Sequence, residues 1–146
     1  MKLNSPEFKN GETIPERFSQ FRDNLSPPID FADVPHGAHS LALIMDDPDA
    51  VPRKFTHWIA FNINPAVSLR ENYIPGGVQF GRNSQGEAAY AGPKPPNGEH
   101  RYFFHAYALD YRLDLPTGAS REEVEQAMDG HILDHAELMG RFAAPT

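Results

Sequence analysis

Proline and glycine are scattered along this chain, and their distribution constrains its fold more than any other feature of the sequence. The 146 residues contain 14 prolines and 11 glycines, which fall between short apolar runs and form no low-complexity block. This distribution of proline and glycine is typical of many short strands joined by turns. The length is sufficient to bury a core, and no repeat or linker divides it, so we expect one domain over residues 1–146.

Four stretches carry the apolar or alternating patterns of strands. Residues 54–64 alternate most clearly, and strict alternation places His57 on the face of Ile59 and Phe61, toward the core. The stretch 100–115 is apolar on both faces in its middle, which predicts a central strand. The other predicted strands are residues 29–31 and 40–45.

The C-terminal part of the chain contains sequence patterns that predict helices. Ser120 followed by Glu123 is a capping box, which predicts a helix over REEVEQAM. Asp129 and Gly130 break this helix, and HILDHAELM (131–139) predicts a second helical stretch that ends at the following glycine. Strands and helices do not alternate, so the sequence predicts a mainly β fold, a sandwich or barrel, with one or two short helices near the C-terminus.

Charge and hydropathy exclude several classes of partner. The net charge of −7 is opposite in sign to what nucleic acid or an anionic lipid surface attracts. The N-terminus has no apolar stretch behind its lysine, which argues against a secretory signal. The longest apolar run, residues 41–45, is too short to span a bilayer, and the absence of cysteine excludes disulfides and thiolate chemistry. We therefore expect a soluble, cytoplasmic protein with no stable membrane insertion.

Strand parity directs several polar side chains toward one end of an apolar cavity. Asp47 leaves its strand on the core side, and His100 and Tyr102 share a face of theirs. Together with His57 these side chains can converge, and the prolines at 95–96 would fix the rim because proline locks its φ angle. Structural explanations compete, since Asp-Pro-Asp is a common turn and a single histidine on an apolar face is more often a core residue.

Four blocks of sequence resemble, in order, the signature blocks of the phosphatidylethanolamine-binding protein family. They are LALIMDDPDA (41–50), HWIAFNI (57–63), GRNSQGEAAYAGPKPPNGEHRYFFHAYALD (81–110) and AMDGHILDHAELMGRF (127–142). The resemblance is to the bacterial and archaeal branch, often called Raf-kinase-inhibitor-like. It implies a Greek-key β-sandwich of two antiparallel sheets with a small pocket for phosphate-type anions. The ligand-binding residues that it implies are Asp47, Asp49, His57, Tyr90, Pro95, Pro96, His100 and Tyr102. Val51 stands where the family has a proline, which predicts a differently shaped rim near Asp49.

The resemblance implies a non-catalytic protein that binds a small ligand of the phosphate or phosphoethanolamine type, with no cofactor and no metal. An aspartate beside a phosphate needs compensation, because like charges repel. Either the ligand supplies an ammonium group for Asp47 or Asp49, or the site gains donors from a protonated His57 or His100. We favour a mixture in which imidazole and backbone donors hold the phosphate.

Other classes of function remain as alternatives. An aspartate and two histidines in an apolar pocket could support hydrolysis, although no nucleophile motif accompanies them. The chain could also act purely as a protein–protein regulator of a kinase or peptidase. His131 and His135 have helical i,i+4 spacing, which would suit a metal, but surface histidines on a helix explain them better. The chain could also form a homodimer, since most soluble oligomers have twofold symmetry.

Overall fold

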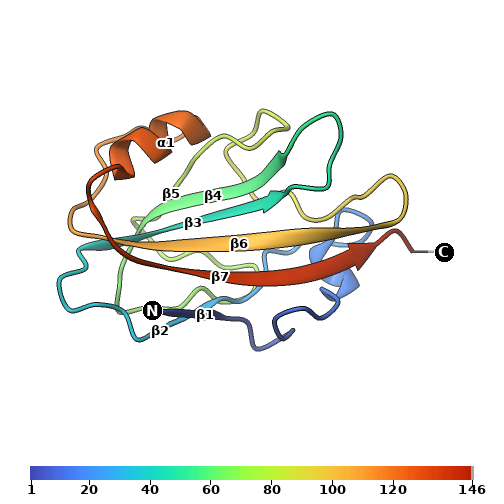
Figure 1. The fold of residues 1–146 in the computed structure, drawn as a ribbon, viewed down its shortest axis with the longest axis horizontal. Helices are drawn as coiled ribbons and strands as arrows, with labels where there is room; N and C mark the ends of the chain where they lie inside the picture. The colour runs from blue at the N-terminus through green and yellow to red at the C-terminus, as the bar shows by residue number, and fades with distance from the viewer. Residues whose placement is uncertain (146) are drawn as a thin grey trace.

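A five-stranded antiparallel sheet forms the centre of the molecule (Figure 1). Its strands lie in the order β5 (Gln79–Phe80), β4 (Phe55–Ile63), β3 (Ser40–Asp47), β6 (Glu99–Leu109) and β7 (Ile132–Ala143). A second antiparallel sheet pairs β1 (Lys2–Asn4) with β2 (Asp30–Ala32). The computed structural model describes residues 1–145. Because β6 returns beside β3 after the run β3–β4–β5, the large sheet has Greek-key order, which confirms the predicted two-sheet, mainly β fold.

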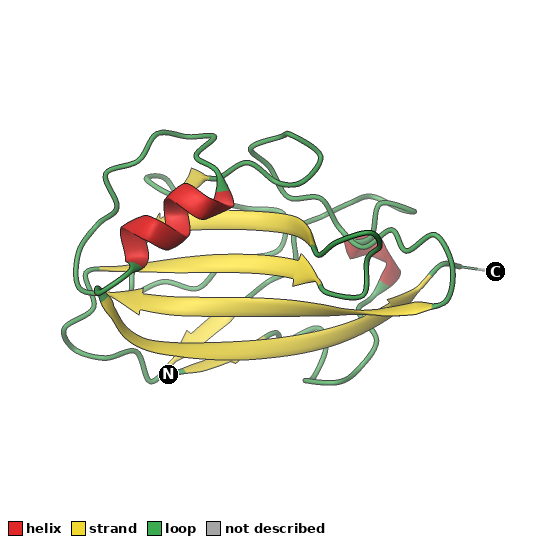
Figure 2. Cartoon of the chain, turned by 45° about the horizontal axis from the view of Figure 1, so that its top comes forward, coloured by secondary structure: helices red, strands yellow, loops and turns green. Residues whose placement is uncertain are grey.

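One α-helix, α1 (Arg121–Met128), precedes β7 and lies at one end of the sheet (Figure 2). Its predicted capping box is present, because the Ser120 hydroxyl accepts from the Glu123 N–H at 3.1 Å while the Glu123 carboxylate accepts from the Ser120 N–H at 2.9 Å. Val124 and Met128 are the buried residues on the inner face of this helix. A short 3₁₀ turn, η1 (Glu16–Phe18), lies in the N-terminal segment.

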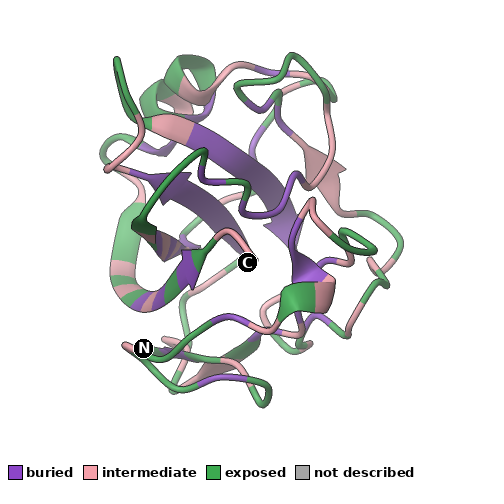
Figure 3. Cartoon of the chain, turned by 90° about the vertical axis from the view of Figure 1, so that its right-hand side faces the viewer, coloured by how far each residue is buried: buried purple, intermediate pink, exposed green. Residues whose placement is uncertain are grey.

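Two apolar clusters cover the two faces of the large sheet. On one face, Leu41, Leu43 and Met45 of β3 pack with the N-terminal segment and the small sheet. On the other face, Ala42 and Ile44 pack beneath α1. β3 and β4 are therefore buried almost continuously, as the purple ribbon in Figure 3 shows. This double burial explains why β3 has an unbroken apolar sequence.

The predicted second helix over 131–139 is wrong, because this part of the chain belongs to β7. β7 pairs with β6 along nearly its whole length, and Leu138, Gly140 and Phe142 alternate toward the core. Pairing with a long strand overrides the local helical preference. Gly140 does not stop a helix; it is a packing position, since a Cβ there would lie 2.4 Å from Ile14 Cγ1. β6, in turn, ends at Leu109, earlier than the predicted end at residue 115.

Strict alternation in β4 fails at two bulges, one opposite the stretch Leu41–Leu43 of β3 and one opposite Met45 and Asp46, and the second of these moves His57. Opposite Met45 and Asp46 of β3, β4 has three residues, because Trp58 pairs with Met45 and Thr56 pairs with Asp46. His57 is the extra residue of this β-bulge. As a result His57 turns to the same face as Trp58, and not to the face that alternation predicts. Bulges of this kind redirect single side chains, and here the bulge directs His57 toward the end of β6.

Candidate ligand-binding site

A cavity of about 220 Å³ opens where β3 ends and β6 begins, at the right-hand end of the sheet in Figure 1. Six of the predicted ligand-binding residues line it: Asp47, His57, Pro95, Pro96, His100 and Tyr102. The other lining residues are Gln20, Ala50, Val51, Phe55, Gln85 and Lys94. The expected convergence is therefore present, by strand parity for Asp47, His100 and Tyr102 and through the bulge for His57, and the ligand-binding role of these residues stays a prediction.

Asp47 and His100 form the central polar contact of the cavity. His100 Nδ1 lies 2.6 Å from Asp47 Oδ2, and the other oxygen of Asp47 accepts the backbone N–H of Asp49 at 2.8 Å. Both side chains are largely buried, with 4% of Asp47 and 12% of His100 exposed. Because a carboxylate can only accept, Nδ1 of His100 donates to it, and Nε2 is left for the cavity.

Burial and hydrogen bonding favour the neutral form of His57 beside this pair. Its Nδ1 lies 2.7 Å from the carbonyl oxygen of Ala91, which can only accept, so Nδ1 carries the proton and Nε2 is an acceptor. Burial lowers the pKa of His57, and the Ala91 carbonyl and the charge of Asp47 offset this only in part. The ring also meets the Tyr102 ring edge-on, with 5.2 Å between centroids.

The Tyr102 hydroxyl is the least satisfied polar group of the cavity. It is buried, and it makes no hydrogen bond of ordinary geometry with any residue of 1–145. Burial raises the pKa of Tyr102, and the negative charge of Asp47 raises it further, so the hydroxyl keeps its proton. A buried hydroxyl without a partner is uncommon, and it can both donate to and accept from a ligand.

The proline-rich loop forms a rigid wall because it is attached to the N-terminal segment. The Gly92 N–H donates to Asn24 Oδ1 at 2.7 Å, and the Gly92 carbonyl accepts from Gln20 Nε2 at 2.8 Å. A Cβ on Gly92 would lie 2.0 Å from the Phe18 carbonyl oxygen, so only glycine allows this close approach. The prolines at 95–96 then follow with fixed φ angles and present their rings to the cavity.

Asp49 and Tyr90, which the resemblance also implied, do not line the cavity. Arg101 holds both oxygens of the Asp49 carboxylate, at 2.8 and 3.0 Å, and its backbone N–H donates to the same group. These contacts lower the pKa of Asp49 to about 2. The Tyr90 hydroxyl donates to the Phe18 carbonyl at 2.7 Å, and its ring packs on Trp58. Neither side chain therefore faces the cavity, and each is held by hydrogen bonds to residues outside it.

Comparison with known proteins identifies the relatives of this chain. A family model described as phosphatidylethanolamine-binding protein matches residues 4–143. The chain belongs to the phosphatidylethanolamine-binding protein family. The UPF0098 proteins of Methanothermobacter thermautotrophicus and Chlamydia trachomatis are 47% and 45% identical to it, each over 97% of this chain and 98% of the relative.

Solved structures of the family have the same fold. The crystal structure of a phosphatidylethanolamine-binding protein homolog from Chlamydia trachomatis has a TM-score of 0.95 and 41% identity, and the match covers 99% of this chain and 97% of that one. The structure of E. coli YbcL, described as a member of the mammalian family, has a TM-score of 0.91 and 27% identity over 99% and 98% of the two chains. Membership supports a small-ligand-binding or regulatory role in general terms.

The structure also bears on the metal alternative. Within residues 1–145 no group of three or more His, Asp or Glu side chains is arranged to hold a metal ion. His131 and His135 are not on one helix, since His131 precedes β7 and contacts Asp110 at 2.8 Å, whereas His135 is an exposed residue of β7. In the same described part of the chain, no helix has the length and apolar character that crossing a membrane requires.

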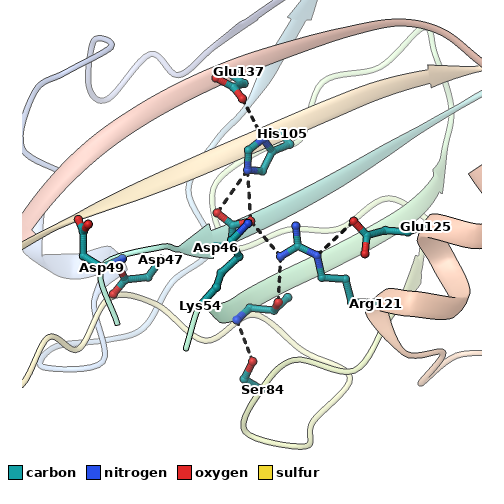
Figure 4. Close-up of polar contacts among 10 residues, drawn as sticks. Asp46, Asp47, Asp49, Lys54, Ser84, His105, Arg121, Glu125 and Glu137 are labelled. Atoms are coloured by element: carbon teal, nitrogen blue, oxygen red, sulfur yellow. Dashed lines mark hydrogen bonds and ion pairs between the residues drawn. The ribbon is translucent and has the colours of Figure 1, made fainter. Parts of the chain in front are cut away.

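A second aspartate–histidine contact, which the sequence did not predict, lies on the other face of the sheet. Asp46 lies 3.2 Å from His105 Nε2 and 2.9 Å from Arg121 Nη1, and Figure 4 shows it pointing away from Asp47. Arg121 also donates to Thr56 Oγ1 at 3.1 Å, and His105 Nδ1 lies 3.3 Å from Glu137. Burial alone raises the pKa of Asp46, but His105 and Arg121 outweigh it and lower the net pKa.

Three polar lining residues were missed by the sequence analysis. Gln85 Nε2 donates to Gln20 Oε1 at 3.0 Å, so two amides from distant segments bridge one side of the mouth. No local pattern marks either glutamine, because only the fold brings the two segments together. Lys94 could have been found from the sequence, since it lies inside the Pro-Lys-Pro-Pro run, and no other lysine or arginine is among the lining residues.

Proposed function

We propose that this chain is a non-catalytic binding protein for small phosphate-containing ligands, and that the cavity around Asp47 and His100 is its binding site. The observation that carries the proposal is the Tyr102 hydroxyl, which is buried at the cavity wall near Asp47 and the Lys94 backbone but makes no hydrogen bond of ordinary geometry within residues 1–145. An unsatisfied buried hydroxyl costs about 1–3 kcal/mol. A ligand oxygen that meets this hydroxyl would remove that cost.

The cavity offers donors that suit an anion. His100 already donates from Nδ1 to Asp47, so a second proton on its ring would be presented to the ligand from Nε2. In that state the imidazolium offsets the charge of Asp47, and repulsion between Asp47 and a phosphate falls. Lys94 adds a cation at the rim, and Gln20 and Gln85 add amide groups.

For a ligand of the phosphoethanolamine type, the structure narrows the choice of partner for the ammonium group. The Asp49 carboxylate is occupied on both oxygens by Arg101. Each oxygen of Asp47 has one partner, His100 or the backbone N–H of Asp49, and a carboxylate oxygen can accept more than one hydrogen bond. Asp47 is therefore the aspartate that we assign to a ligand amine.

The composition of the lining favours binding over catalysis. The residues that line the cavity include no serine, threonine or cysteine, so a covalent mechanism would need a less common nucleophile, such as Asp47, Lys94 or a histidine. A hydrolase would instead use His57 or His100 as an acid–base group acting on water. Turnover of a panel of phosphate and carboxylate esters, lost in His100→Ala, would replace the binding proposal with a hydrolase.

Isothermal titration calorimetry with inorganic phosphate and with phosphoethanolamine tests the proposal. We expect saturable binding by the wild type, loss of binding in His100→Ala, and unchanged binding in His135→Ala, which removes an exposed histidine from β7. Circular dichroism of both variants checks that they are folded. No binding by the wild type between about pH 5 and 8, the range in which histidine changes its charge, would contradict the proposal.

A further inference from the structure

The chain contains two asparagine–glycine pairs, Asn10–Gly11 and Asn97–Gly98. In such a pair the backbone nitrogen of the glycine can attack the side-chain carbonyl carbon of the asparagine, because glycine has no side chain to obstruct it. The bond to the amide nitrogen breaks, ammonia leaves, and a five-membered succinimide forms. Water then opens the ring to aspartate or isoaspartate, so the chain gains one negative charge without any oxidant or reductant.

The reacting groups of Asn97–Gly98 are free. Both residues are exposed, and Gly98 has φ +66° in an open turn where even an added Cβ would meet nothing within 4 Å. Within residues 1–145, neither the Asn97 side chain nor the Gly98 N–H has a hydrogen-bond partner. The Gly98 nitrogen can therefore approach the side-chain carbonyl carbon of Asn97 without breaking a hydrogen bond.

The same groups of Asn10–Gly11 are held by β7. The Gly11 N–H donates to the Met139 carbonyl at 2.7 Å, and Asn10 Oδ1 accepts the Met139 N–H at 2.8 Å. Attack at this pair would require both hydrogen bonds to break, and each contributes about 1 kcal/mol. The fold thus protects one pair and leaves the other reactive.

Asn97 does not line the cavity, but it lies in the loop that does. It directly follows the prolines at 95–96, and Lys94 and His100 on either side of it in the sequence both line the cavity. A carboxylate at this position would add a negative charge beside the rim cation. Isoaspartate would in addition route the backbone through the side chain and alter the loop that leads into β6.

We propose that Asn97 is a site of spontaneous deamidation, and that its conversion lowers the affinity of the cavity for anions. The second part rests on the function proposed above. A single added charge near a solvent-exposed site changes affinity by roughly two- to fivefold, because water and salt screen it. The modification would act as a slow, irreversible reduction of ligand binding as the protein ages.

Peptide mapping by mass spectrometry tests the modification without any ligand. Purified wild-type protein is kept at mildly alkaline pH, and the conversion of amide to acid is followed at both pairs. We expect Asn97 to convert at least about tenfold faster than Asn10 in the folded protein, since about 1.4 kcal/mol corresponds to tenfold in rate. In urea the two rates should become similar. Equal rates in the folded protein, or no conversion at Asn97, would overturn the assignment.

Calorimetry with inorganic phosphate tests the consequence separately. Asn97→Asp should bind phosphate roughly two- to fivefold more weakly than wild type, with a smaller difference at high salt, whereas Asn97→Gln should bind as wild type does. Equal affinity of the two variants would refute the effect on binding. If the wild type itself does not bind phosphate, the proposed function and this consequence both fail, while the peptide map still decides whether Asn97 is modified.

Discussion

Two consecutive aspartates at the end of β3 each contact a histidine of β6, but on opposite faces of the sheet. Asp47 lies 2.6 Å from His100 and opens onto the cavity. Asp46 lies 3.2 Å from His105 and is enclosed by Arg121 and by Lys54, whose Nζ is 3.9 Å away. Figure 4 shows this enclosed cluster connecting α1, β3, β6 and β7.

The difference lies in the neighbours of the two pairs. Around Asp46 the charge is compensated by ion pairs with His105 and Arg121, although Oδ2 of Asp46 makes no hydrogen bond of ordinary geometry within residues 1–145, so the cluster joins elements of the fold. Around Asp47 the Tyr102 hydroxyl is left without a partner among residues 1–145, and Nε2 of His57 is available as an acceptor. We therefore expect the contact that borders the cavity, and not the one enclosed by ion pairs, to mark a ligand site.

The largest effect that separates the two pairs is expected from Asp46→Asn. Removing one member of a buried ion pair leaves the other charge uncompensated, and we expect a loss of about 3 kcal/mol in the free energy of unfolding. Asp47→Asn is the matched control. Its amide can still accept the Asp49 N–H, so we expect a loss of only about 1 kcal/mol, accompanied by weaker binding of phosphoethanolamine, whose ammonium group would lose its carboxylate partner. Urea denaturation measures both, and equal losses would contradict the comparison.

The dependence of this effect on pH has a definite sign. The pKa of Asp46 in the folded protein lies below its ordinary value of 3.8, because His105 and Arg121 outweigh burial. A depressed folded pKa stabilises the fold above the unfolded pKa, and this contribution is lost as pH falls through the folded value. The gap in unfolding free energy between wild type and Asp46→Asn should therefore narrow below about pH 4.

The sequence predicted one side of this comparison and not the other. Parity placed Asp47, His100 and Tyr102 together because β3 and β6 pair without a shift up to Asp46 and Phe103, and β6 pairs regularly with β7 through His100 and Tyr102. His57 reached the expected cavity by way of a bulge that no alternation rule predicts. The Asp46 cluster depends on Arg121, which only the tertiary fold brings to β3.

The misassigned C-terminal strand has a similar physical cause. HILDHAELM offers apolar residues at both helical and alternating spacings, so the sequence pattern alone does not decide between them. Pairing with β6 decides for the strand, and the packing of Gly140 against Ile14 fixes its place. Both contacts are long-range, whereas the helix α1 was predictable because its capping box is local.

A smaller effect is expected from Tyr102→Phe, which sharpens the comparison by removing one oxygen. If a ligand satisfies the Tyr102 hydroxyl, phosphate affinity should fall about tenfold, or about 1.4 kcal/mol. Stability without ligand should be unchanged or higher by about 1 kcal/mol, because an unpaired buried hydroxyl disappears. Tyr107→Phe, a half-buried tyrosine of the same strand, is the control and should leave affinity unchanged. Calorimetry showing the same affinity for both variants would remove Tyr102 from the site.

The smallest effect is expected from Asp49→Asn, the aspartate that the family resemblance places in the pocket and the structure pairs with Arg101. Its side chain is 29% exposed and that of Arg101 is 52% exposed, so water screens the pair and the loss of stability should stay below about 1 kcal/mol. Phosphate affinity should be unchanged, because Asp49 does not line the cavity.

A comparison of this variant with Asp47→Asn shows which of the two aspartates contributes to ligand binding. A loss of phosphate binding as complete as in His100→Ala would show that Asp49 leaves Arg101 and turns into the cavity when a ligand binds. The contrast between a compensated and an available carboxylate would then hold only for the unliganded protein.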